Sequence, residues 1–317
     1  SGRTRNAGPR YVNGILGQVD RGAIAARKFR VVLDCGNGAS AVTSPSLLHG
    51  LSVRYTTLNG NVDGTFPGHL SEPTEANLVD LVRTVPAVGA DFGVAHDGDA
   101  DRAVFVDENG RYVPGERMLA LLARDAVRSA GGGLVVTPVT SSLAVEEVIR
   151  PLGGKILYTR VGSPVVSRAM AESKAIFGGE ENGGCLFPAH QLARDGAMTL
   201  AKVLELLARE KRALSEVLAE LPPYVLVKRK VPCPLALRDV VISELTEELT
   251  REAGADTQVL TLDGVKVQNP RGWYLIRPSG TEPLYRIFAE AKGSKEAEAL
   301  ADTALARLRS ALARHGA

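Results

Sequence analysis

The chain has 317 residues, of which 44% are hydrophobic and 23% charged, and its formal net charge is +2. This length and composition indicate a globular protein of two or three domains with sizeable cores, and the near-neutral charge without a long basic run argues against nucleic acid as a partner. Three widely spaced cysteines and the lack of an apolar stretch approaching ~20 residues argue against a disulfide framework and a membrane span, so we expect a cytoplasmic protein without a membrane partner.

The first predicted domain covers residues 11–109 and follows a linker remnant at residues 1–10. Its strands and helices alternate, which is typical of a parallel sheet. The predicted order is strand 29–34, a helix ending near Gly50, strand 53–58, helix 75–85, and strands 91–95 and 103–106.

A glycine-rich turn, Gly36-Asn37-Gly38, follows the first strand and nearly fits the fingerprint of a dinucleotide-binding loop. That fingerprint needs an acidic residue at the end of the next strand to hold a ribose. The next strand ends instead at Leu58-Asn59. We therefore interpret the segment as a tight turn between a strand and a helix.

Asp97, Asp99 and Asp101 lie in the loop between the last two strands of this domain. Side chains at alternate positions of an extended segment point the same way, so the three carboxylates can converge on one point. Negative charges that close repel one another unless a cation lies between them, and oxygen ligands suit a hard divalent ion such as Mg²⁺. We predict a magnesium site here and expect the neighbouring His96 to pack or hydrogen-bond rather than to act as a base.

Three other interpretations fit this loop less well. A helix-loop-helix calcium site accepts Glu108 at its twelfth position, but it needs flanking helices and a glycine at its sixth position, where this chain has Arg102. A haloacid-type phosphatase would need a lysine and further acids that the sequence does not let us assign. A solvated acidic turn is the commonest meaning of a charge cluster, but the apolar flanks place the loop at the end of a buried sheet, where α/β proteins bind ligands.

The second predicted domain covers residues 110–221 and repeats the alternation of helices and strands. Asp195 before a helix and Ser163-Pro164 at the start of another are the expected capping residues. The predicted order is helix 116–129, strand 134–137, a helix from Ser142, strand 155–159, a helix from Ser163, strand 174–178 and a long helix after Asp195.

Two segments of the second domain could bind a ligand. Glycines bracket Glu180, Glu181 and Asn182, and carboxylate and amide groups can hydrogen-bond the neighbouring hydroxyls of a sugar, although a flexible turn is the commoner meaning of such a stretch. Arg160 and Gly162 follow a strand and precede a helix, a position that favours an anion.

Pro222-Pro223 marks a boundary, and the short strands joined by tight turns after it predict an antiparallel α+β domain over residues 222–317. The predicted elements are strands 224–231, 258–262, 265–268, 273–277 and 284–292, and helices 238–252 and 294–314. The predicted fold class is therefore α/β, with two three-layer α/β domains that contain parallel-rich mixed sheets and a C-terminal antiparallel α+β domain.

Residues 277–283 have the composition of a phosphate-binding loop. The hydroxyls of Ser279 and Thr281, the backbone N–H groups around Gly280, and the flanking Arg277 and Arg286 would suit a dianion. Ser-Gly-Thr between strands is often only a turn, and the two guanidinium groups favour the phosphate interpretation.

Three motifs of this chain resemble, in order and spacing, those of the α-D-phosphohexomutases, which include phosphoglucomutase, phosphomannomutase and phosphoglucosamine mutase. They are residues 97–102, residues 179–184 with the later 194–196, and residues 277–283, supported by phrases at 34–38 and 63–68. The resemblance covers nearly the whole chain from about Tyr11. It implies domains around a cleft and a transfer of phosphoryl between C1 and C6 of a hexose phosphate, with a hexose 1,6-bisphosphate as intermediate and activator.

The resemblance also implies a role for each candidate residue. Mg²⁺ would be held by Asp97, Asp99 and Asp101, and the catalytic Arg102 would lie beside the reacting phosphate. The implied substrate-binding residues are Arg160, Gly162, Glu180, Asn182, Arg277, Ser279, Gly280, Thr281 and Arg286.

The sequence departs from the family in one respect. Family members begin with a further α/β domain that carries a phosphoserine, and no such motif occurs here, so we expect this chain alone not to run the full reaction. Three hypotheses stay open: a phosphohexomutase (an isomerase) whose N-terminal domain is missing from this sequence, which we favour, a non-catalytic hexose-phosphate-binding protein, and a metal-dependent phosphatase. The identity of the hexose stays open, as does the choice between a homo-oligomer and a separate N-terminal domain as protein partner.

Overall fold

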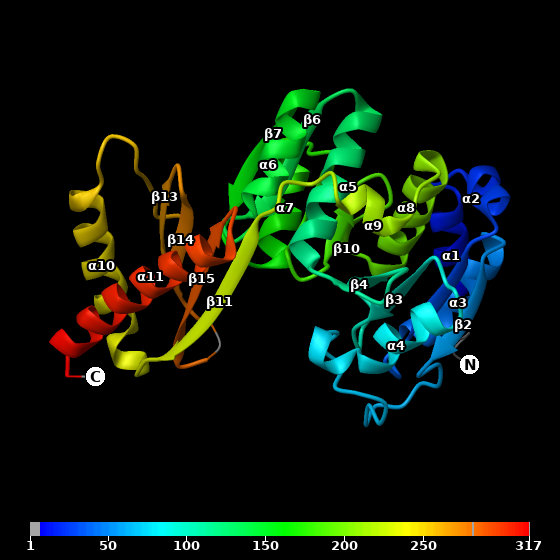
Figure 1. Ribbon diagram of the computed structural model, residues 1–317, viewed down its shortest axis with the longest axis horizontal. Coiled ribbons are helices and arrows are strands. Elements are labelled where there is room, and N and C mark those ends of the chain that lie inside the picture. The colour runs from blue at the N-terminus through cyan, green and yellow to red at the C-terminus, as the bar shows by residue number, and fades with distance from the viewer. Residues whose placement is uncertain (1–6, 281, 317) are drawn as a thin grey trace, which may run out of the picture. The chain divides into compact units, whose positions relative to one another are not determined.

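The computed structural model describes residues 7–280 and 282–316. The chain divides into two compact units, shown in Figure 1. The first runs from the N-terminal side to residue 137 and includes residues 145–157 and 163–221. The second comprises residues 138–144 and 158–162 together with the C-terminal part from residue 222.

Sheet A of the first unit has the strand order β2-β1-β3-β4-β5, in which β1 pairs in parallel with β2 and β3, while β4 and β5 add antiparallel strands. Its strands are β1 (Arg30–Asp34), β2 (Arg54–Leu58), β3 (Phe92–His96), β4 (Ala103–Asp107) and β5 (Tyr112–Val113). The helices in this stretch are α1 (Gly8–Leu16), α2 (Arg21–Arg27), α3 (Ser40–Gly50), the short 3₁₀ helix η1 (Glu75–Asn77) and α4 (Val79–Ala87).

The centre of sheet A is covered on both faces, because every residue of β3 and β4 is buried. Helix α4 packs its apolar residues Leu81 and Val85 onto one face, against Val32 and Val106. A side chain at Gly93 of β3 would approach Val85 within 2.6 Å, so the glycine allows the helix to lie close to the sheet. The loop that leaves β3 therefore starts from a rigid base.

Sheet B has the order β10-β9-β8-β6-β7, with β6 and β8 parallel and β8, β9 and β10 antiparallel. Its strands are β6 (Gly133–Pro138), β7 (Gly154–Thr159), β8 (Phe177–Gly179), β9 (Cys185–Phe187) and β10 (Gln191–Arg194). The helices here are α5 (Gly115–Ala130), α6 (Leu143–Ile149), η2 (Arg150–Leu152), α7 (Ser163–Ser173), α8 (Gly196–Glu210) and α9 (Leu214–Leu218).

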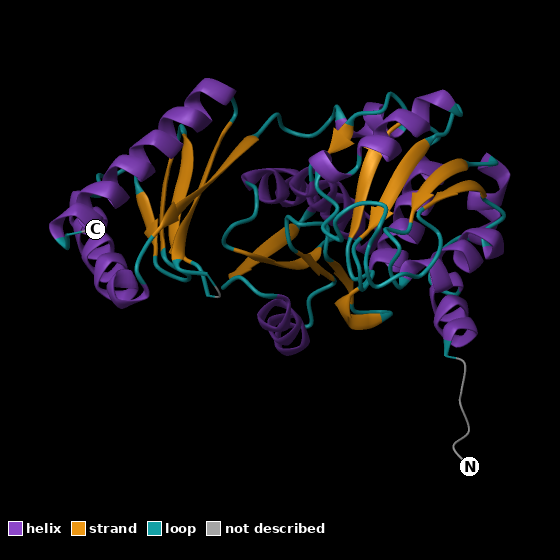
Figure 2. Ribbon diagram, turned by 90° about the horizontal axis from the view of Figure 1, so that it is seen from below, coloured by secondary structure: helices purple, strands orange, loops and turns teal. Residues whose placement is uncertain are grey.

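Sheet C of the second unit is antiparallel throughout, in the order β11-β15-β14-β13-β12. Figure 2 shows helices α10 and α11 on one face of this sheet, where both pack into its core. The strands are β11 (Val225–Pro232), β12 (Gln258–Leu260), β13 (Val265–Asn269), β14 (Gly272–Pro278) and β15 (Leu284–Ala291), and the helices are η3 (Leu235–Leu237), α10 (Arg238–Glu252) and α11 (Ser294–Arg314). The predicted fold class is thus confirmed.

Several elements differ from the sequence prediction. Strand β8 begins at Phe177 rather than at residue 174, because Lys174 has a positive φ of 55° that ends helix α7 instead of starting a strand. Strands β9 and β10 and the helices α1 and α2 were not predicted. The two strands have only three and four residues, too few to show a period in the sequence.

The sequence analysis also predicted free cysteines and no membrane-spanning helix. Cys35, Cys185 and Cys233 are free and buried. Among the described residues, no helix is both long enough and apolar enough to cross a membrane.

Asp195, the N-cap of α8, also anchors helix α1. Its carboxylate, 2% exposed, accepts hydrogen bonds from the backbone N–H of Met198 at 2.8 Å, the Tyr11 hydroxyl at 2.6 Å and the Gln191 amide at 2.7 Å. Burial next to this carboxylate raises the pKa of Tyr11, so the hydroxyl stays a donor. One residue thereby joins the start of the described chain to the segment that follows sheet B.

Replacing Asp195 should destabilise the protein far more than replacing an exposed cap. Asp195→Ala removes the cap of α8 and leaves the partly buried Tyr11 hydroxyl without its acceptor, so we expect the free energy of unfolding to fall by about 2–4 kcal/mol in urea denaturation. The matched control is Asp20→Ala, since exposed Asp20 caps α2 through Ala23 at 2.9 Å and should cost about 1 kcal/mol or less. Equal losses in the two variants would contradict the anchoring role.

Candidate functional site

The loop between β3 and β4 brings Asp97, Asp99 and Asp101 together. One carboxylate oxygen of each lies within 4.8 Å of the others. Asp97 is buried, Asp101 is partly buried and Asp99 is exposed, so the cluster opens toward solvent on one side. An all-oxygen set with an open side fits a hard divalent cation such as Mg²⁺. Antiparallel strands flank the loop, which excludes the helix-loop-helix calcium site.

Backbone contacts hold this loop in place. Ala100 adopts a positive φ of 64°, and its N–H donates to the Asp97 carbonyl at 3.1 Å. The turn after β1 packs directly onto it, because the N–H of Ala39 donates to the Gly98 carbonyl at 3.0 Å and a Cβ at Gly38 would lie 2.5 Å from the same oxygen. The glycine-rich turn is thus a strand-to-helix turn, as predicted, and it supports the acidic loop.

His96 is fully buried and hydrogen-bonded at both ring nitrogens. Its Nδ1 lies 2.9 Å from the Arg102 carbonyl and its Nε2 lies 3.2 Å from the Ser44 hydroxyl. A carbonyl only accepts, so Nδ1 carries the proton and Nε2 accepts from Ser44. Burial lowers the pKa of His96, so the ring is a neutral support for the loop, in line with the sequence expectation.

Arg102 is held by two carboxylates, one of which the sequence analysis missed. Its Nε lies 2.5 Å from Asp97 Oδ2, and its two Nη atoms lie 2.6 and 3.1 Å from the two oxygens of Glu72. These hydrogen bonds from Arg102 hold the pKa of Glu72 below its usual value. Glu72 comes from the long segment between β2 and η1, 30 residues away in sequence, so no local pattern could have pointed to it.

Of the two carboxylate oxygens of Asp101, Oδ2 is hydrogen-bonded, and Oδ1 has only a long ion-pair contact of 3.9 Å with Arg102 Nε. Its Oδ2 accepts from Arg194 Nε at 2.9 Å. Its Oδ1 is buried and accepts no hydrogen bond from the described residues, and burial raises the pKa of this carboxyl group. A buried carboxylate oxygen without a donor is costly, and a bound cation would satisfy it.

The predicted sugar-binding loop lies against the acidic loop. The Gly183 carbonyl accepts from the N–H of Ala103 at 3.2 Å, and Gly183 has a positive φ of 93°. Glu180 is 4% exposed and accepts from Arg194 at 2.9 Å, whereas Asn182 is exposed and its side-chain oxygen accepts from the N–H of Gly184 at 3.2 Å. The structure therefore brings Glu180 and Asn182 next to the three aspartates within one unit.

The second unit carries the predicted phosphate-binding residues on a row of cations. Arg277 on β14, Arg286 on β15 and Lys230 on β11 are direct cross-strand partners, so their side chains lie on one face of sheet C. Glu282 pairs with Arg286 and lies 3.8 Å from Lys230. Like charges placed opposite one another are unfavourable unless an anion binds between them, and Lys230 is a member of the row that the sequence analysis missed.

The remaining predicted residues of this unit lie around Arg277. Its Nη2 is 3.1 Å from Asp263 Oδ2, and its Nε is buried without a hydrogen-bond partner among the described residues. The same Asp263 accepts from the N–H of Val161 at 2.9 Å, which brings the segment 160–162 with its exposed Arg160 and its Gly162 (φ 133°) to Arg277. Ser279 is buried and Gly280 exposed, and Thr281 lies outside the described residues.

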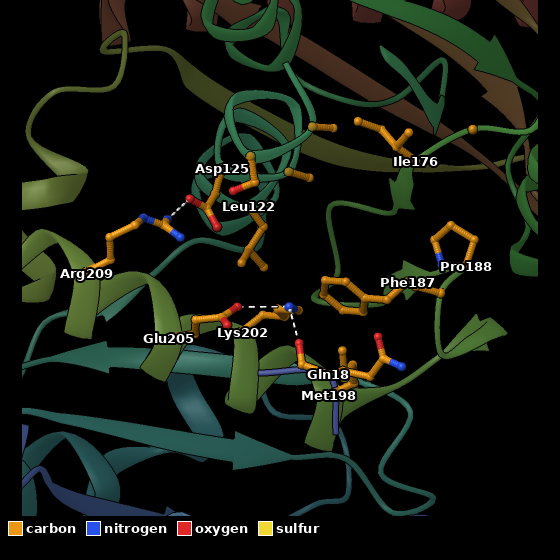
Figure 3. Close-up of a pocket in the computed structure, with 15 residues that line it drawn as sticks. Gln18, Leu122, Asp125, Ile176, Phe187, Pro188, Met198, Lys202, Glu205 and Arg209 are labelled. Atoms are coloured by element: carbon orange, nitrogen blue, oxygen red, sulfur yellow. Dashed lines mark hydrogen bonds and ion pairs between the residues drawn. The ribbon is translucent and has the colours of Figure 1, made fainter. Parts of the chain in front are cut away.

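A separate cavity of about 590 Å³ lies between α5, α8 and residues 187–189. As Figure 3 shows, Arg209 reaches Asp125, and Lys202 pairs with Glu205 at 2.9 Å. Its size would admit a small ligand, but its charged side chains are paired with one another, and among the described residues its lining contains none of the predicted site residues.

Comparison with known protein families gives three consecutive matches to the phosphoglucomutase/phosphomannomutase family. Residues 9–110 match its alpha/beta/alpha domain II, residues 114–224 its alpha/beta/alpha domain III, and residues 226–307 its C-terminal domain. The chain belongs to this family. The resemblance inferred from the three motifs is thereby confirmed.

Relatives of this chain include a phosphoglucomutase/phosphomannomutase of Thermococcus kodakarensis, 42% identical over 95% of this chain and 65% of the relative. A probable phosphoglucosamine mutase of Methanopyrus kandleri is 43% identical over 92% of this chain and 63% of the relative. A solved phosphoglucomutase/phosphomannomutase family protein of Burkholderia thailandensis superposes with a TM-score of 0.84 at 27% identity, over 98% of this chain and 65% of that one. The chain thus spans slightly under two thirds of the length of these relatives.

Glu72 should increase the affinity of the acidic loop for a divalent cation by neutralising Arg102. Glu72→Gln leaves the Arg102 guanidinium paired with Asp97 alone, so it neutralises the aspartates more strongly. We therefore expect Mn²⁺ to bind about 3- to 10-fold more weakly, as a charge change of one unit near a partly exposed site implies. Isothermal titration calorimetry would measure this. The control Glu75→Gln, at an exposed carboxylate of the same segment, should change the affinity less than twofold. Equal effects of the two substitutions would refute the role of Glu72.

Proposed function

We propose that this chain carries the metal-, sugar- and phosphate-binding parts of a phosphohexomutase. The reaction is a Mg²⁺-dependent transfer of a phosphoryl group between C1 and C6 of a hexose phosphate through a hexose 1,6-bisphosphate. The observation that carries the proposal is the cluster of Asp97, Asp99 and Asp101 beside Arg102, with the Glu180 loop against it. Membership of the phosphoglucomutase/phosphomannomutase family supports it.

In this proposal, Asp97, Asp99 and Asp101 hold Mg²⁺. The donor set fits such an ion, as does the buried Asp101 oxygen that accepts no hydrogen bond from the described residues. When bound, the ion would offset negative charge on the transferring phosphoryl group. Arg102 lies beside the cluster and can exchange one of its carboxylate partners for a phosphate oxygen, because guanidinium groups bind both in the same forked geometry.

Glu180 and Asn182 are proposed to bind the sugar. A carboxylate accepts from hydroxyl groups and an amide both donates and accepts, so the two side chains together can hold neighbouring hydroxyls. The burial of Glu180 and its ion pair with Arg194 keep its position fixed, which supports a role in orienting the ring rather than in proton transfer.

The phosphate that does not react is proposed to bind Arg277, Arg286, Ser279 and Gly280, with Thr281, Arg160 and Gly162 also in contact. The row of cross-strand cations that includes Lys230 supports this assignment. A fixed anion site lets either phosphorylated end of the sugar be held while the other end reacts, which is how one set of residues can serve both halves of the cycle.

The full reaction is proposed to need the part of the relatives' length that these 317 residues do not span. By resemblance to the family, that part contributes the serine that carries the phosphoryl group. The second candidate is a non-catalytic hexose-phosphate-binding protein, which the proposed metal, sugar and phosphate sites would also fit.

The test measures binding and turnover separately. We expect the 317-residue chain to bind glucose, mannose or glucosamine 6-phosphate in calorimetry, to bind more weakly after Mg²⁺ is removed with EDTA, and to show no interconversion of the 1- and 6-phosphates with added bisphosphate. Adding the N-terminal domain of a relative should restore turnover if the mutase assignment is right. Turnover by the 317 residues alone would refute the need for a further part, and failure to bind all three sugar phosphates would refute the function.

Arg277 should contribute most of the affinity for the phosphate group. Arg277→Met removes charge-assisted hydrogen bonds worth about 1.5–3 kcal/mol, so glucose 6-phosphate should bind about 10- to 100-fold more weakly. Arg271→Met, at an exposed arginine in the turn between β13 and β14, is the control and should leave the affinity within twofold. Lys230→Met should weaken binding by a smaller factor. An unchanged affinity in Arg277→Met would place the phosphate elsewhere.

A further inference from the structure

Arg194 connects two of the proposed binding loops through one guanidinium group. Its Nη1 lies 2.9 Å from Glu180 Oε2, its Nε lies 2.9 Å from Asp101 Oδ2, and its Nη2 also pairs with Asp101. Arg194 ends β10, 14 residues after Glu180 and 93 residues after Asp101. The two loops are distant in sequence and also meet through the backbone hydrogen bond from Ala103 to Gly183, and Arg194 adds a side-chain bridge that joins their carboxylates.

The position of Arg194 is fixed by its neighbours. A Cβ at Gly184 would lie 2.2 Å from Cδ of Arg194, so the arginine stem lies directly on the glycine. The next residues hold the backbone on both sides, because the N–H of Asp195 donates to the Cys185 carbonyl at 3.0 Å and the N–H of Gly196 donates to the Ala100 carbonyl at 3.2 Å. The guanidinium therefore cannot move far without moving one of the two loops.

The bridge to Arg194 uses only one of the two carboxylate oxygens of Asp101. Arg194 occupies Oδ2, and Oδ1 is buried without a hydrogen bond among the described residues. A cation that binds Oδ1 leaves Oδ2 with Arg194, so it favours the orientation of this carboxylate in which the same guanidinium also holds Glu180. Because the guanidinium is planar and rigid, a shift of Asp101 is passed on to the group at its other edge, which is Glu180.

We propose that Arg194 is a positioning residue that makes cation binding by Asp101 and hexose binding by Glu180 depend on each other. This inference rests on the function proposed above for these two loops. The cation and the sugar each favour the arrangement in which Arg194 holds both carboxylates, so each ligand strengthens the binding of the other. By linkage, the two factors are equal.

A merely structural ion pair would behave differently. Its loss would lower the stability of the fold and could weaken the binding of each ligand. It would not change the factor by which one ligand raises the affinity for the other. The measurement is therefore that ratio. The affinity for Mn²⁺ is determined by calorimetry with and without saturating glucose, mannose or glucosamine 6-phosphate, and the affinity for the sugar phosphate with and without saturating Mn²⁺.

In the natural sequence we expect each ligand to tighten the other about 5-fold or more, within the usual range of coupling between sites. In Arg194→Met the factor should fall below twofold. Arg194→Lys should give the same result, because an ammonium group cannot reach two carboxylates in the forked geometry. Gly184→Ala keeps the guanidinium but displaces its stem, and it should also reduce the coupling.

The matched control is Arg229→Met. Arg229 also bridges two carboxylates, Asp302 and Glu298, at 2.6 Å each, but on the surface of the other unit. This variant should keep the full coupling factor. Circular dichroism reports whether each variant is folded, and if Arg194→Met is unfolded, Arg194→Lys and Gly184→Ala decide the result.

Two results separate the inference from the function on which it rests. If the natural chain binds both ligands but shows no coupling, or if coupling survives in the folded Arg194 and Gly184 variants, the inference is wrong and the proposed function stands. If the natural chain binds neither Mn²⁺ nor any of the three sugar phosphates, the proposed function is wrong and the inference falls with it.

Discussion

Mutual repulsion among Asp97, Asp99 and Asp101 is the constraint around which the first unit is built. Three carboxylates whose oxygens lie within 4.8 Å of one another can coexist only where positive charge compensates them. Two arginines from different parts of the chain do so, Arg102 at Asp97 and Arg194 at Asp101. Both arginines also bind a further glutamate, so the compensation spreads outward into the neighbouring loops instead of ending at the cluster.

The second unit contains a cluster of positive rather than negative charges. Arg277, Arg286 and Lys230 are neighbours across three strands, and Asp263 and Glu282 neutralise them only in part. Sheet C supplies the rigid platform, with α10 and α11 on one face. Under the proposed function, the negative site would hold the metal and the positive site would hold a phosphate group.

The sequence predicted features whose residues are close together in the chain, and it missed contacts between residues that are far apart in the chain. Helices α10 and α11 have the predicted bounds, because long amphipathic segments with clear boundaries carry strong local signals. The three aspartates were found because they are near neighbours in sequence. Glu72 and Lys230 were not, and Arg194 was noted only as part of a motif, without its partners. Each of the three acquires its meaning from a partner on another segment, 30 residues away for Glu72 and 93 for Arg194. Short strands such as β9 were missed for lack of a period.

The backbone contact between Gly38 and Gly98 limits how far the acidic loop can move. The two backbones touch so closely that no side chain fits at residue 38, and helix α3 begins two residues later. The loop cannot widen in that direction unless the helix is displaced as a whole. In the proposed metal site, helix α3 would therefore help to fix the spacing of the three carboxylates through this backbone contact.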